Sequence, residues 1–167
     1  MLGSGKVSLL LLLLILFSVA PSDAVVPVCV DPPSGLVSWW KGEDNANDSA
    51  GMNHGEIYEA SFEDGMVGRA FSFDGNSYVE APDEGLPLGS AERTIVAWVY
   101  PTAYTYGLNH IIHYGSSWSG ASWGLVIRSD GQLIAHEWIN YEGAGNVPLN
   151  QWSHVAISLS NDGVKKH

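Results

Sequence analysis

Hydrophobic and polar positions alternate over short stretches of the chain, and Gly, Asn and Asp interrupt them every few residues. Runs rich in β-branched and aromatic residues are typical of strands, and no window repeats its apolar residues at helical spacing. The sequence therefore predicts strands at residues 36–40, 70–74, 78–81, 94–100, 111–114, 124–128, 132–138 and 153–160. Short strands in this succession predict an all-β protein with a sandwich or jellyroll fold.

Two stretches say more about the arrangement of the strands. In residues 123–136, Asp130-Gly131 separates two apolar runs and supplies the positive φ angles of a tight hairpin turn. In residues 94–99 both alternating sets of side chains are apolar, as expected where both faces of a strand are covered. The sequence therefore predicts a hairpin at the first stretch and a central strand at the second.

The N-terminus carries the features of an export signal. Lys6 precedes an apolar run at residues 7–20, Pro21 ends that run, and small residues lead up to Ala24. We expect cleavage after Ala24 and a secreted protein, with residues 25–34 as a Pro-rich lead-in. The alternative is a retained membrane anchor, although about 14 apolar residues are few for a bilayer span.

Composition removes several partners from consideration. The chain has 18 acidic and 7 basic side chains and a net charge of −11. Cleavage would remove one charge of each sign, Lys6 and Asp23, and leave that value unchanged. Nucleic acids and anionic membrane surfaces need clusters of Lys and Arg, so neither is an expected partner. Cys29 is the single cysteine and is expected to be an inert thiol or to pair with another chain.

Ordered blocks of sequence then point to a family. The chain resembles laminin G-like jellyroll domains of the concanavalin A-like lectin and glucanase superfamily at residues 35–44, 47–55, 68–75, 77–82, 94–101 and 152–156. The resemblance implies a two-sheet antiparallel sandwich over residues 35–167 with Trp39, Trp40, Trp98 and Trp152 mostly in the core. Family members usually continue beyond the turn at residues 161–163 into further strands, so we expect the C-terminal strands to be missing.

Relatives of this kind often hold calcium, an ion that prefers oxygen ligands. The loop after the first predicted strand offers such oxygens on Glu43, Asp44, Asn47, Asp48 and Asn53. A calcium site in this loop is one expectation. The alternative is a solvated acidic loop, because Asp and Asn are also turn residues.

Histidines give a weaker signal for metal. His110 and His113 are three apart in a predicted strand, which predicts that they lie on opposite faces and cannot share one ion. His136 and Trp138 are expected to share a face and to have a packing role. For His154, at the start of the last strand, a structural role is favoured.

Glycanases of the superfamily carry acidic residues at alternating positions of one strand, and no Glu-x-Asp-x-x-Glu pattern occurs in this sequence. Catalysis is therefore not expected. Sugar recognition uses exposed aromatic rings beside polar groups, and Trp118, Tyr104 and Tyr106 in loops are the candidates for it. The alternative for Trp118 is packing over an end of the sandwich, whereas Trp123 is expected in the core.

Together these features predict a secreted, non-catalytic binding module that recognises a glycan or an extracellular protein surface, with calcium as a possible aid. The alternative is a structural or accessory segment of a larger secreted enzyme or adhesin.

Overall fold

The computed structural model describes residues 31–116, 122–136, 141–160 and 163–166. The chain divides into two compact units, Met1–Pro32 and Pro33–His167, and all the described strands lie in the second. The predicted signal segment, its cleavage position Ala24 and Cys29 fall outside the described residues. Among the residues that are described, none belongs to a helix long and apolar enough to cross a membrane.

The regular elements of the second unit are strands, which confirms the predicted all-β class. They are β1 (Glu56–Tyr58), β2 (Ser61–Asp64), β3 (Arg69–Ser72), β4 (Tyr78–Glu80), β5 (Arg93–Val99), β6 (Leu108–Gly115), β7 (Ser122–Arg128), β8 (Gln132–His136), β9 (Tyr141–Asn146), β10 (Ser153–Ser160) and β11 (Gly163–Lys166). Sequence analysis did not predict β1, β2 or β9. Beyond the turn expected at residues 161–163, β11 pairs with β10.

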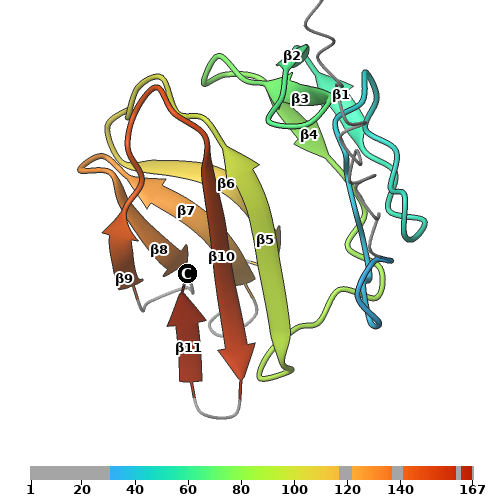
Figure 1. Cartoon of the computed structure of the whole chain (residues 1–167). Helices are drawn as coiled ribbons and strands as arrows, with labels where there is room; N and C mark the ends of the chain where they lie inside the picture. The colour runs from blue at the N-terminus through green and yellow to red at the C-terminus, as the bar shows by residue number, and fades with distance from the viewer. Residues whose placement is uncertain (1–30, 117–121, 137–140, 161–162, 167) are drawn as a thin grey trace, which may run out of the picture. The chain divides into compact units, whose positions relative to one another are not determined.

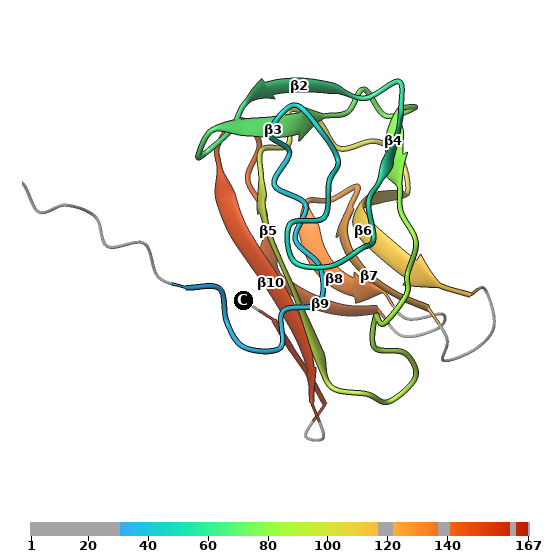
Figure 2. The same cartoon turned by 90° about the vertical axis from the view of Figure 1, so that its right-hand side faces the viewer.

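Two sheets form neighbouring layers, as both views show (Figures 1 and 2). One sheet has the strand order β6-β7-β8-β9, and the other has the order β11-β10-β5. Two further hydrogen-bonded pairs, β1 with β4 and β2 with β3, come from the N-terminal part of the unit. All these pairings are antiparallel. The predicted two-sheet antiparallel sandwich is therefore confirmed.

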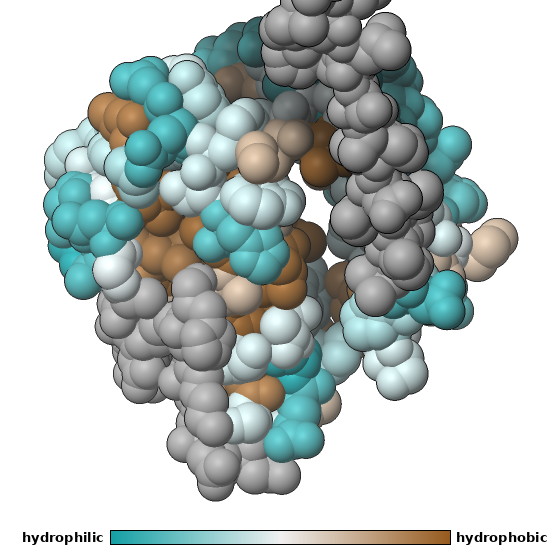
Figure 3. Space-filling model, in the orientation of Figure 1, coloured by the Kyte–Doolittle hydropathy of each residue, from teal (hydrophilic) through white to brown (hydrophobic). Residues whose placement is uncertain are grey.

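The hydrophobic core lies between the two layers. Leu125 of β7 and Ile157 of β10 are both 0% exposed, and Trp123 is 1% exposed, which confirms its predicted core position. Burial of an apolar side chain of this size stabilises the fold by about 1.5 to 3 kcal/mol. Figure 3 shows hydrophobic residues in the middle of the face that β5 and β10 cross.

The predicted hairpin at residues 123–136 is present as β7 and β8, paired from Gly124 with His136 to Ile127 with Leu133. Its turn differs in one detail. Gly131 alone adopts a positive φ, 84°, and its N–H donates to the carbonyl oxygen of Arg128 at 2.9 Å. The Asp130 carboxylate instead accepts the N–H of Gln132 at 3.1 Å, so it acts through hydrogen bonding.

The predicted strand at residues 36–40 is not formed. Trp40 makes one isolated bridge, to Asp48, and the segment has no ladder. The N–H of Trp39 donates to the Asp48 carboxylate at 2.8 Å, and its carbonyl oxygen accepts the N–H of Ser49 at 2.8 Å. A loop with its own side-chain acceptor therefore takes the place of a partner strand.

The strand predicted to be central, β5, lies at the edge of its described sheet, because β10 is its one described partner. Its inner side chains, including Ile95 and Ala97, pack against the core. Its outer side chains are half-exposed, with Val96 at 53% and Trp98 at 49%. The prediction of a central strand is therefore wrong within this sheet, although the two apolar faces that suggested it are real.

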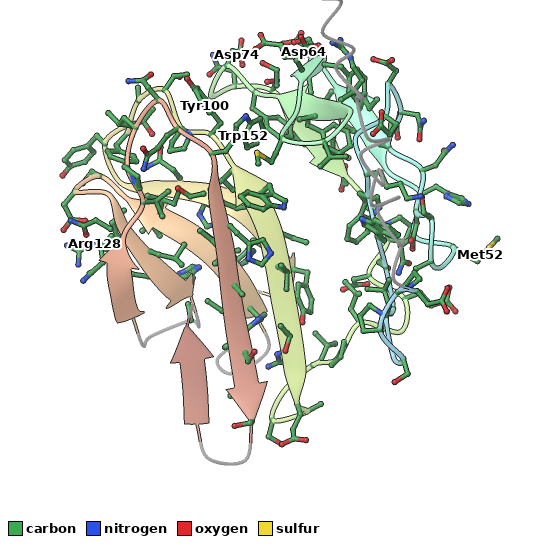
Figure 4. The ribbon with its side chains drawn as sticks, in the orientation of Figure 1. Met52, Asp64, Asp74, Tyr100, Arg128 and Trp152 are labelled. Carbon is green, nitrogen blue, oxygen red and sulfur yellow. The ribbon has the colours of Figure 1, made fainter. Side chains whose placement is uncertain are left out.

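The aromatic residues of this outer face contact one another across the strands. The ring centroids of Trp98 and His154 are 4.9 Å apart, and those of Tyr100 and Trp152 are 5.4 Å apart. Figure 4 labels the second pair. Trp98 and Trp39 were expected in the core, and this expectation is wrong. Trp39 is 44% exposed, and Trp98 is exposed to a similar degree. Pairing with the His154 ring accounts for an aromatic residue at Trp98 without full burial, and the ammonium group of Lys41 lies 4.4 Å from the centre of the Trp39 ring.

Candidate functional site

Asp48, a predicted calcium ligand, is the anchor of its loop. Its side chain is 5% exposed. One carboxylate oxygen accepts the N–H groups of Trp39, Ala50 and Gly51 at 2.8 to 3.0 Å, and the other accepts the N–H of Asn53 at 3.2 Å. Burial by itself would raise the pKa of Asp48, but the backbone N–H groups of Trp39, Ala50 and Gly51 hold it far below its usual value.

The other predicted calcium ligands have partners of different kinds. The Asn53 side chain donates to the Ser38 hydroxyl at 2.9 Å and to the Glu84 carbonyl oxygen at 3.0 Å. Glu43 accepts the backbone N–H of Arg69, and Asp44 forms an ion pair with the guanidinium of Arg69 at 3.2 Å. Over the described residues, no group of three or more His, Cys, Asp or Glu side chains is arranged to hold a metal ion. Calcium binding stays a prediction.

The three aromatic candidates for sugar binding have different positions. Tyr106 is fully exposed, whereas Tyr104 packs against the hydrophobic core and contacts the turn glycine Gly131. Trp118 lies outside the described residues. Of these two tyrosines, Tyr106 therefore presents its ring to solvent and Tyr104 does not.

Three histidines meet on the face of the four-stranded sheet that points away from the core. The ring centroid of His113 is 5.3 Å from those of His110 and His136, and the remaining distance is 5.6 Å. The prediction that His110 and His113 lie on opposite faces is therefore wrong. We call these three side chains the imidazole cluster.

A β-bulge in β6 is the physical reason. His110 pairs with Val126 and Ile112 pairs with Leu125, so Ile111 is an extra residue on its strand. An inserted residue of this kind reverses the alternation of side chains beyond it, which brings His113 to the face of His110. Strict alternation in the sequence could not reveal this.

Gly124 of β7 lies between two members of the imidazole cluster, since it pairs with His113 on one side and His136 on the other. A Cβ atom at Gly124 would lie 2.8 Å from a ring carbon of His113. The glycine therefore provides the space that the His113 ring occupies. Burial lowers the pKa of His110 and of His113, and the neighbouring imidazoles lower both further, so both rings are neutral at neutral pH.

An open pocket of about 430 Å³ lies next to the cluster and shares His113 with it. The residues that line it come from β4 with the chain after it and from the end of β6: Tyr78, Val79, Glu80, Ala81, Asp83, His113, Tyr114 and Gly115. A second pocket of about 390 Å³ shares Glu80 and Ala81 with the first and is also lined by His54, Glu56 and Pro82. We call the first of these the β4–β6 pocket.

Tyr78 gives the β4–β6 pocket an aromatic wall. It pairs across the strands with Tyr58, and the two rings are stacked with their centroids 4.7 Å apart and their planes at 12°. Tyr78 remains 50% exposed, so part of its ring faces solvent. A half-exposed ring that a second ring supports is a stable surface for an apolar face of a ligand.

The polar groups of the β4–β6 pocket are mostly hydrogen-bond acceptors. Glu80 and Asp83 supply carboxylates, and the neutral ring of His113 can accept or donate one hydrogen bond. Tyr114 directs its hydroxyl elsewhere, to the Pro87 carbonyl oxygen at 3.0 Å. An aromatic surface beside carboxylates suits a ligand that has apolar ring faces and several hydroxyl donors.

The sequence pattern does not predict this pocket. The alternation in residues 78–80 could have placed Tyr78 and Glu80 on one face of their strand. No local pattern, however, indicates that the end of β6 lies opposite them, because that juxtaposition depends on the tertiary fold.

Comparison with known proteins places the fold. A family model described as the concanavalin A-like lectin/glucanases superfamily matches residues 73–166. The chain belongs to this superfamily. The match contains β4 to β11, and so it includes both layers of the concanavalin A-like sandwich and the β4–β6 pocket. A search of curated proteins finds no match.

One solved structure matches the fold of this chain. Domain 4 of AbnA, a GH43 extracellular arabinanase from Geobacillus stearothermophilus, was solved in complex with arabinotriose and matches with a TM-score of 0.58 and 24% identity. The alignment covers 74% of this chain and 65% of the other, so the chain spans less than two thirds of the structure it matches. At this identity the similarity supports the fold.

Proposed function

We propose that this concanavalin A-like unit is a secreted, non-catalytic carbohydrate-binding module and that the β4–β6 pocket is its ligand site. The observation that carries the proposal is the half-exposed Tyr78 ring beside the carboxylates of Glu80 and Asp83 in one open pocket. Sugar rings stack on aromatic faces through their C–H groups, and their hydroxyls donate to carboxylates.

The solved neighbour adds support at the level of the fold. It is a domain of an extracellular arabinanase whose structure contains an arabinan fragment, and it has the same general architecture as this unit. An extracellular protein surface is the alternative ligand. The pocket favours the glycan, because a half-exposed aromatic ring beside two carboxylates fits a sugar ring and its hydroxyls.

The test is binding of a glycan array, followed by calorimetry on the best ligand, with the chain and two variants. Tyr78→Ala should weaken binding at least about tenfold, or roughly 1.4 kcal/mol, because it removes the stacking surface. Tyr78→Phe keeps the ring and should bind nearly as well. Tyr106→Ala is the matched control, since its exposed tyrosine lies outside the pocket.

The result also distinguishes the two candidate sites. If Tyr106→Ala abolishes binding and Tyr78→Ala does not, the ligand binds at the loop of Tyr106, and the assignment of the β4–β6 pocket as the ligand site is wrong. Absence of oligosaccharide products after long incubation would support the non-catalytic part of the proposal.

Export and calcium assistance belong to the same proposal and have separate tests. Mass spectrometry of the protein collected from the medium should give an N-terminus at Val25, directly after Ala24. Thermal unfolding with calcium and with chelator tests the ion, because a ligand of the native state raises the midpoint. An unchanged midpoint would exclude calcium.

A further inference from the structure

The charge of the β4–β6 pocket limits what it can bind. Glu80 and Asp83 line this pocket, and Glu56 and Glu80 line the adjoining one. Neither set of lining residues contains a Lys or an Arg. Carboxylates without a nearby cation repel anionic groups of a ligand and accept hydrogen bonds from neutral hydroxyls.

One titratable neighbour, Tyr58, responds to these carboxylates, and a second, His113, is neutral. A hydrogen bond to Glu56 raises the pKa of the Tyr58 hydroxyl, and the charges of Glu56 and Glu80 raise it further. Burial and the neighbouring His136 lower the pKa of His113. The imidazole in the pocket wall therefore carries no positive charge at neutral pH, and it does not offset the carboxylates.

Arg93 is the cation found beside a lining residue, Tyr114, and its guanidinium is engaged by the carbonyl oxygens of Pro87 and Gly89 at 2.7 and 2.6 Å. The net charge of the chain is −11, so approach of a polyanion is unfavourable over long distances as well. Arg69, one of the few basic residues, is engaged by the carboxylates of Asp44 and Asp64.

We infer that the pocket selects neutral, hydroxyl-rich oligosaccharides and excludes glycans that carry carboxylate or sulfate groups. This inference rests on the proposed function and adds the class of ligand to it. Glu80 and Asp83 accept the hydroxyl hydrogens of a neutral sugar, whereas a uronic acid or a sulfated sugar would bring a second anion against them.

The first experiment compares neutral with acidic oligosaccharides of equal length, using the full chain at low and at high salt. Neutral arabinan, xylan and glucan fragments should contain the ligand, and its affinity should change less than about twofold with salt, because no counterions are released. Binding of oligogalacturonate or heparin fragments that weakens with salt would overturn the inference and leave the proposed function standing. Binding of neither class would overturn the proposed function itself.

Charge-altering variants then test whether the pocket is the cause. Glu80→Gln should weaken binding of the neutral ligand about tenfold, and Glu80→Lys should admit acidic fragments that the parent rejects. Glu63→Lys is the matched control, because Glu63 lies on β2 outside the pocket and the change in net charge is the same. If Glu63→Lys gains as much affinity for acidic fragments as Glu80→Lys does, the net charge of the chain excludes anions. This result would overturn the inference that the pocket carboxylates do so.

Discussion

Replacement of Asp48 by alanine should destabilise the unit far more than its position in a loop suggests. The carboxylate accepts four backbone N–H groups, from Trp39, Ala50, Gly51 and Asn53. Alanine offers no acceptor in their place. The loop between Trp39 and Asn53 would then lose the group that closes it.

The magnitude follows from which donors water can reach. Trp39 is 44% exposed and Ala50 is exposed, so water can replace the acceptor for their N–H groups. Asn53 is 4% exposed, and its N–H would be left buried without an acceptor. A buried donor without a partner costs about 1 to 3 kcal/mol, and loss of the charge-assisted bonds brings the total to about 3 kcal/mol.

Urea denaturation followed by tryptophan fluorescence and circular dichroism measures the free energy of unfolding. Asp74→Ala is the matched control, because the Asp74 carboxylate also accepts two backbone N–H groups, those of Asn76 and Ser77 at 2.9 Å, in an exposed turn. It should cost much less than Asp48→Ala, since water can reach both donors. Equal losses in the two variants would refute the reasoning that burial of the donor sets the cost.

Two further predictions concern stability. His110 and His113 have pKa values lowered in the native state, so the unfolded chain takes up protons first as the pH falls. The free energy of unfolding should therefore keep its full value above about pH 6.5 and decline below it. In a His110→Asn, His113→Asn double variant, the urea midpoint should change less between about pH 7 and 5. Tyr104→Phe should leave stability unchanged or raise it by up to about 1 kcal/mol, because the buried Tyr104 hydroxyl has no hydrogen-bond partner among the described residues. Tyr114→Phe loses the hydrogen bond to the Pro87 carbonyl oxygen and should cost about 1 kcal/mol in the same assay. A midpoint of the double variant that still follows the parent, or equal effects of the two phenylalanine variants, would contradict these expectations.

The parts of the fold that local chemistry determines could be predicted from the sequence. The β7–β8 hairpin was found because Gly131 is a residue that accepts a positive φ between two apolar runs. Strand β10 could be found because its inner side chains, those of Val155, Ile157 and Leu159, are apolar and alternate with others along the strand. Both signals act over a few residues and need no knowledge of distant segments.

The candidate site could not be predicted in the same way. One extra residue, Ile111, decides that His110 and His113 share a face, and nothing in the local pattern distinguishes a bulged strand from a regular one. In the same way, the loop around Asp48 has the composition of a calcium-binding loop. The backbone N–H groups that the Asp48 carboxylate accepts could be identified only once the fold was known. Sequence patterns identified the residue types, and tertiary structure determined which of them meet.

The half-exposed outer face of β5 has a consequence for handling the protein. A strand at the edge of its described sheet that presents Val96 and Trp98 to solvent can pair with a second chain, and the net charge of −11 keeps chains apart at neutral pH. That repulsion disappears near the isoelectric point of about 4.7. Colloidal stability should therefore be lowest in mildly acidic, high-salt solutions, where turbidity would mark association of folded molecules through this strand.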